Sequence, residues 1–438
     1  MSESEAIDNS VIPTQKKDRI ASLDVARGVA VLGILACNIW AFGWPIYAWR
    51  DMGMMGLENY HRESFIAMMQ FLDGTQRGIF SMLFGVGTVL FMERMAKRGI
   101  GIEGADIFFR RTVILFVFGL MNAFVFMWFG DILFHYAAVT FIIYGLRNAK
   151  LKTLVSIILF IMVFNMGIKS LSYLGRTEAK AGWEEARALQ KEGKELTSEQ
   201  TSKLKEWYRR TDTERTAKRA QDQIDTIRSG FGGTWTTHAS WSVKFETTYF
   251  YYGFFFDVLI MMFLGIILYR IGLFSRSFSK KKLAALAVIL IGLGSAWRFV
   301  KVSAIWGTGF GEYDALASAG FAVFEQPTRL ILSVGYLSAI LFLCRLGRDG
   351  IIKKAFAATG QMALTNYLSQ SIICAFLFYG FGYGLYGQLY GLDLMTVVGV
   401  IWAIQLIWSP LWLKRYRYGP FEWVWRSLTY GQKQPMKR

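Results

Sequence analysis

Apolar residues fill most of this chain in long segments that are separated by short polar loops. Several segments reach the roughly 20 residues that a helix needs to cross a bilayer. Their approximate positions are residues 23–44, 70–94, 112–129, 132–146, 154–174, 249–273, 283–305, 329–344, 362–381 and 395–413. The pattern predicts an all-α fold: a polytopic bundle of about ten transmembrane helices, with a further half-span at residues 315–324.

Lysine and arginine gather in every second loop between these segments. The basic loops lie at residues 94–111, 147–152, 280–282 and 345–354. Short loops rich in lysine and arginine stay on the cytoplasmic side of a membrane. Ten spans with both termini cytoplasmic satisfy all of these loops, and also the basic pair Lys414 and Arg415 after the last segment.

One long polar stretch, residues 176–244, interrupts the apolar pattern. Its helix-forming residues and mixed charges predict one or two amphipathic helices outside the membrane, ending in a flexible glycine-rich stretch at residues 230–233. We therefore divide the chain into an N-terminal transmembrane part (1–175), an extracytoplasmic helical insertion (176–244) and a C-terminal transmembrane part (245–438).

The composition supports a membrane protein and limits the binding partners that can be expected. The 438 residues are 53% hydrophobic and only 18% charged, which is more apolar than an average soluble domain. The net charge of +17 would suggest nucleic acid in a soluble protein, but here it sits in the loops, so we expect the lipid bilayer and no nucleic acid as partner. Cysteine and histidine show no metal-binding spacing, so no metal site and no permanently bound cofactor are expected.

Polar side chains inside apolar segments are candidate functional groups, because they are costly there unless paired or hydrated. Asp24 and Arg27 of the first segment are three positions apart, and Arg27 and Asn38 are eleven apart on the same stripe. Asp73 and Arg77 of the second segment stand at pair spacing. The alternative for Arg27 is that it anchors the first helix at the membrane surface.

The string WFGDILFHYA at the head of the fourth segment holds Asp131 and His135, four positions apart on one helix face. The carboxylate would then orient the imidazole for a role as a base. The alternative is structural, with Asp131 capping the helix and His135 making an interhelical contact. We expect this pair and the polar groups of the first two segments to line one cavity formed mainly by the first four segments.

Several strings resemble a known family. RYRYGPFEWVWRSLTYG (residues 415–431), GDIL (130–133) and FSMLFGVG (80–87) resemble the YeiB-like proteins, the family of domain of unknown function 418. The LDVARG start of the first segment is similar to the heparan-α-glucosaminide N-acetyltransferase-like proteins, and acyltransferase-3 proteins also carry an arginine there. The resemblance implies a bacterial inner-membrane protein that transfers an acyl group from acyl-CoA to an extracytoplasmic sugar or lipid-linked acceptor.

This resemblance also assigns roles, with one departure. Arg27 matches the arginine of the acyltransferases, but Asn38 stands where acyltransferase-3 proteins have a histidine, and an amide cannot act as a base. His61 lies where the heparan-type enzymes have a catalytic histidine, so the base would come from His61 or from the Asp131–His135 pair. Donor-binding groups would be Arg27 with Asp24, Asn38, Asp73 and Arg77.

Two other functions remain open from the sequence. A transporter or exporter of a small polar molecule would use the same intramembrane charges as binding groups. A non-catalytic membrane factor of YeiB-like type would need no base at all.

Overall fold

The computed structural model describes residues 21–50, 59–99, 101–307, 314–347 and 350–438. Within these ranges the regular structure is helical, and the only β-type pairing is an isolated bridge between Tyr416 and Lys437. The predicted all-α fold is confirmed.

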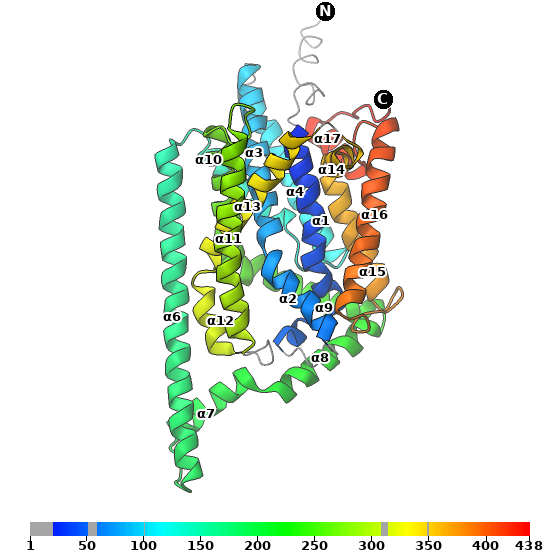
Figure 1. The fold of residues 1–438 in the computed structure, drawn as a ribbon. Coiled ribbons are helices and arrows are strands. Elements are labelled where there is room, and N and C mark those ends of the chain that lie inside the picture. The colour runs from blue at the N-terminus through cyan, green and yellow to red at the C-terminus, as the bar shows by residue number, and fades with distance from the viewer. Residues whose placement is uncertain (1–20, 51–58, 100, 308–313, 348–349) are drawn as a thin grey trace, which may run out of the picture.

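The core of the molecule is a bundle of membrane-length helices (Figure 1). Among the described residues, seven segments are long and apolar enough to cross a bilayer. They contain α1 (Ala21–Gly43), α3 (Thr75–Lys97), α4 (Ile102–Phe124), α6 (Leu151–Lys191), α11 (Lys280–Ile305), α13 (Glu325–Leu346) and α16 (Gly391–Arg415). Three shorter helices, α5 (Leu133–Gly145), α10 (Phe255–Arg270) and α15 (Ala363–Phe378), stand at the other predicted positions. The chain is a multi-pass membrane protein.

The remaining helices lie mainly at the two ends of the bundle. They are η2 (Ile46–Arg50), α2 (Asn59–Phe71), α7 (Ser198–Thr211), α8 (Thr213–Arg228), α9 (Phe231–Lys244), the π-helical η4 (Phe245–Phe254), α12 (Ala315–Ala322), α14 (Ile351–Gln361) and α17 (Pro420–Tyr430).

The start of α1, helix α17 and the C-terminus lie at one end of the bundle, and α7 and α8 lie at the other (Figure 1). The predicted basic loops follow α3, α5, α10 and α13, and these helices all finish at the end that holds α17. We call this the basic end, and the end that holds α7 and α8 the opposite end. The four basic loops therefore lie at the same end of the bundle, as their alternation along the chain predicted.

Small residues let the central helices touch. A Cβ atom added to Gly85 of α3 would collide with the backbone of Met262 in α10, and one added to Gly265 of α10 would collide with that of Met82 in α3. Such close backbone approach is typical of helix pairs in membranes. Gly85 therefore serves close packing of α3 on α10, whereas a Cβ on Gly87 would meet only the guanidinium of Arg27.

The insertion is more helical than the sequence suggested. Helix α6 continues without a break to Lys191, and α7, α8 and α9 follow it. The stretch at residues 230–233 is not a flexible end: Gly230, with φ +117°, precedes the first turn of α9. Helix α8 is fixed to the bundle, because Arg228 donates to the carbonyl of Tyr386 at 2.7 Å.

Candidate functional site

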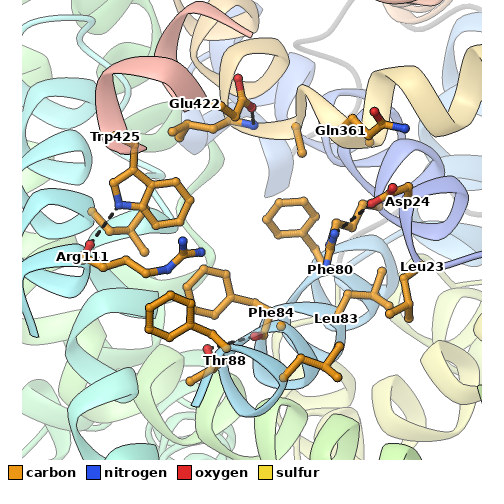
Figure 2. Close-up of a pocket in the computed structure, with 18 of the residues that line it drawn as sticks. Leu23, Asp24, Phe80, Leu83, Phe84, Thr88, Arg111, Gln361, Glu422 and Trp425 are labelled. Atoms are coloured by element: carbon orange, nitrogen blue, oxygen red, sulfur yellow. Dashed lines mark hydrogen bonds and ion pairs between the residues drawn. The ribbon is translucent and has the colours of Figure 1, made fainter. Parts of the chain in front are cut away.

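A cavity of about 240 Å³ opens among α1, α3, α4, α14, α15 and α17. Its α3 lining runs from Arg94, near the basic end, back to Phe80. Fourteen residues of helix correspond to roughly 20 Å, so the cavity reaches well into the bundle. Asp24 and Gln361 face Trp425 and Arg111 across it (Figure 2).

Four arginines line the cavity against two acids. The arginines come from four different helices: Arg27 from α1, Arg94 from α3, Arg111 from α4 and Arg426 from α17. The charges of Arg426 and Arg27 act on that of Arg111. Of the acids, Asp24 pairs with Arg27 at 3.0 Å. The cavity therefore carries a surplus of positive charge, which favours an anionic ligand.

The second acid, Glu422, holds two helices together. Pro420 begins α17, and Glu422 in its first turn reaches the N-terminus of α15. Its carboxylate accepts hydrogen bonds from the N–H groups of Leu364 (2.7 Å) and Thr365 (3.0 Å) and from the Thr365 hydroxyl (2.5 Å). Burial raises the pKa of Glu422, although these bonds lower it. The glutamate of the string GPFEWVWR therefore has a structural role. It accepts hydrogen bonds from backbone N–H groups at the start of α15 that have no partner within their own helix.

The aromatic part of the same string fixes α17 against α4. The guanidinium carbon of Arg111 lies 3.9 Å from the centre of the Trp425 ring, and Trp425 Nε1 donates to the Arg111 carbonyl at 2.9 Å. This geometry holds the Arg111 side chain at the wall of the cavity. Trp425 therefore positions Arg111 and packs α17 on α4.

The inner end of the cavity is mainly apolar. Leu83, Leu115 and Leu133 line it together with Tyr367. Tyr367 donates to the Asp131 carboxylate at 3.3 Å and accepts from the N–H of Ile132 at 3.2 Å. Asp131 is therefore separated from the cavity by a single tyrosine.

Asp131 itself is buried in a hydrogen-bond network. Its carboxylate accepts from Asn122 Nδ2 at 2.8 Å and from the N–H of Phe134 in the first turn of α5 at 2.8 Å. The second contact agrees with the capping alternative for this residue. The network takes up the carboxylate oxygens, so they do not orient His135.

His135 is oriented differently from the prediction. Its Nδ1 lies 2.7 Å from the backbone carbonyl of Asp131, and the carboxylate near the ring is that of Glu246, whose Oε2 is 3.8 Å from Nε2. The prediction that the Asp131 carboxylate orients His135 is wrong, because only the backbone carbonyl of Asp131 contacts the ring. The reason is that the Asp131 side chain turns toward α4 and α15 instead.

The predicted pair of Asp73 and Arg77 is replaced by another ion pair. Arg77 binds Asp257 of α10 at 2.7 Å, and Asp257 also binds Arg329 of α13 at 2.9 Å. Glu325 continues the network, 3.2 Å from Arg329 and 2.5 Å from Lys301. A partner 180 positions away in the chain offers Arg77 a better geometry than its neighbour does.

The remaining predicted residues lie apart. His61 is on α2, and its Nδ1 accepts from the N–H of Leu392 at 3.2 Å at the start of α16. Asn38 is on α1 but does not line the cavity. Among the predicted site residues, only Asp24 and Arg27 line the cavity, so the single cavity expected from the first four segments is not formed.

Sequence reasoning missed several residues at these sites. They are Arg111, Arg426, Tyr367 and Glu422 at the cavity, and Glu246 beside His135. The GPFEWVWR string could have indicated the residues of α17. Glu246 lies beside an aromatic run, and nothing in its neighbouring sequence indicates a functional role.

The comparisons with known proteins agree on one family. Residues 268–432 match the family model "Protein of unknown function (DUF418)". YxaH of Bacillus subtilis (strain 168), described as uncharacterized, is 30% identical, covering 98% of this chain and 99% of its own. YeiB of Escherichia coli (strain K12), described likewise, is 28% identical over 94% of this chain and 96% of its own. No solved structure matches.

Proposed function

This chain belongs to the YeiB-like family (DUF418), and we propose that it is an integral membrane acyltransferase. In this proposal the protein lies in the bacterial cytoplasmic membrane with both termini inside. It transfers an acyl group from acyl-CoA, taken as a substrate, to an extracytoplasmic sugar or lipid-linked acceptor.

The observation that supports this proposal is the cavity at the basic end. An acyl-CoA donor combines several anionic phosphates with an apolar acyl chain. The arginine-rich wall of Arg27, Arg111 and Arg426 suits the phosphates, and the leucine-lined inner end suits the acyl chain. If the basic end is cytoplasmic, the donor enters from the compartment in which acyl-CoA is made.

The reacting group would lie at the inner end of the cavity. There the acceptor oxygen forms a bond to the acyl carbon, the C–S bond breaks and the thiolate leaves. We place the proton acceptor at Asp131, which reaches the cavity through Tyr367 at 3.3 Å. The proton of the acceptor would pass to the Tyr367 oxygen as the Tyr367 hydroxyl gives its own proton to Asp131, and His135 stands behind the carboxylate. His61, on the opposite side of the membrane, is the alternative base if the acceptor is activated there.

The test is acyl transfer by the purified protein with a labelled acyl-CoA. Arg426→Gln should raise KM for acyl-CoA about tenfold or more, because a charge-assisted hydrogen bond contributes about 1.5–3 kcal/mol. Arg276→Gln removes an equal charge from an exposed loop at the same end and should leave KM unchanged. Tyr367→Phe should lower kcat more than it changes KM.

If acyl-CoA neither binds nor reacts, the acyltransferase proposal is contradicted and a transport function is favoured. The observation that supports a transporter is the buried network of Arg77, Asp257, Arg329 and Glu325, because intramembrane charges often mark substrate or ion pathways. The two functions differ in a measurable way. A transporter should lose uptake or export with Asp257→Asn while Arg426→Gln remains active.

A further inference from the structure

A second polar cluster lies behind Asp131, away from the cavity. His135 is 3% exposed, and acceptor groups lie close to both of its ring nitrogens. Nδ1 faces the Asp131 carbonyl at 2.7 Å, and Glu246 Oε2 lies 3.8 Å from Nε2. Both of these contacts are made by oxygen acceptors.

This environment offers places for two protons. A neutral imidazole carries a single N–H and can serve one acceptor, whereas an imidazolium donates from both nitrogens. With Nδ1–H directed to the Asp131 carbonyl, Nε2 faces Glu246. A second proton makes this contact favourable in either of two positions. On Nε2 it gives an imidazolium that pairs with the Glu246 carboxylate. On Glu246 it gives a carboxylic acid whose proton points toward Nε2.

The environment of Glu246 also favours a proton shared with His135. It is 7% exposed, and neither of its oxygens has a hydrogen-bond partner among the described residues. An ionised carboxylate without such partners is costly to bury, and a shared proton removes that cost. The residue stands in the π-helical segment η4, a rare conformation that recurs at functional sites.

The other charged groups near the ring have partners of their own. Arg77 of α3 acts on His135 electrostatically, but it is paired with Asp257 at 2.7 Å. The Asp131 carboxylate accepts from Asn122 and Tyr367. Phe134 and Phe254 supply the aromatic contacts around the imidazole. Among the described residues, Glu246 is thus the carboxylate left to share a proton with His135.

We propose that His135 and Glu246 form a buried proton-binding site, which holds one proton between imidazole Nε2 and the carboxylate at neutral pH. The ligand of this site is the proton itself. The site goes beyond the proposed function, because it would serve an acyl transfer that releases a proton and a proton-coupled transporter alike. Its test therefore uses no activity.

The experiment locates the proton in the full-length protein in lipid nanodiscs. Nitrogen-15 NMR of labelled histidine reports the protonation of His135, whose signal is assigned by its loss in His135→Gln. Infrared difference spectra of wild type against Glu246→Gln report whether Glu246 is a protonated carboxylic acid. We expect, at neutral pH, either an imidazolium at His135 or a carboxylic acid band that disappears in Glu246→Gln.

In Glu246→Gln the imidazole should be neutral at neutral pH, whichever of the two groups carries the shared proton in the wild type, because the carboxylate that stabilises the second proton is gone. Glu195→Gln, at an exposed position, should change neither spectrum. A wild-type protein with neutral His135 and ionised Glu246 would overturn the proposal. If Glu246→Gln does not fold, Glu246→Asp shortens the side chain, and unchanged His135 signals together with an unchanged carboxylic acid band in that variant would overturn it equally.

Discussion

At the scale of single residues, Glu422 joins the C-terminal helix to the membrane bundle. Its carboxylate receives three hydrogen bonds from Leu364 and Thr365 at the start of α15. Glu422→Ala should lower the free energy of unfolding by about 1–3 kcal/mol, because buried donors lose their acceptor. Thermal unfolding of the detergent-solubilised protein measures the change.

The matched control is Glu195→Ala, which removes an exposed carboxylate and should melt like the wild type. Glu422→Gln keeps one acceptor oxygen and should fall between the two. Equal melting of Glu422→Ala and the control would show that α17 is not held by this contact.

Single residues are also where sequence reasoning reached its limit. Spacing along one helix suggested that Arg77 would pair with Asp73 and that the Asp131 carboxylate would face His135. Both residues instead use partners brought close by the fold, Asp257 for Arg77 and Asn122 for Asp131. Periodicity shows which side chains share a helix face, but not which helix packs against that face.

At the scale of helices, prediction was far more successful, because the length and apolarity of a membrane helix are local properties. The predicted segment at residues 283–305 became α11 (Lys280–Ile305), and that at 395–413 became α16 (Gly391–Arg415). The polar insertion was harder. There α9 begins at Phe231, inside a glycine-rich stretch whose composition suggests flexibility.

The contact between α3 and α10 gives a prediction at this scale. Gly85→Ala should destabilise the protein by about 1–3 kcal/mol or more, since overpacking forces backbones apart. The added methyl group would collide with the backbone of Met262. Gly292→Ala in α11 makes the same change where the added Cβ would meet no atom of a neighbouring helix within 4 Å, and it should be neutral or stabilising.

Melting temperatures of the two glycine variants, measured side by side, decide this point. If Gly85→Ala and Gly292→Ala have the same melting temperature, α3 and α10 have room to separate. The close packing of α3 on α10 would then not be a source of stability.

At the scale of the whole molecule, the candidate site could be predicted only in part. Arg27 was recognised because it lies in the first segment of a resembling family. The cavity that surrounds it also needs Arg111 of α4 and Arg426 of α17, which are 315 positions apart in the chain (426 minus 111). Only the assembled bundle brings these charges to one wall.

The orientation of the whole molecule is the most general prediction, because the donor must enter from the basic end. The three native cysteines, Cys37, Cys344 and Cys374, are first replaced by alanine or serine. A cysteine is then placed at Gly232, exposed in α9 of the insertion, or at Lys281, exposed at the basic end.

A membrane-impermeant thiol reagent added to intact cells should label the Gly232→Cys variant and leave Lys281→Cys unmodified until the cells are opened. Positive loops remain inside, so this result places the arginine-lined cavity toward the cytoplasm. Labelling of Lys281→Cys alone would reverse the molecule in the membrane and remove the route by which cytoplasmic acyl-CoA reaches the cavity.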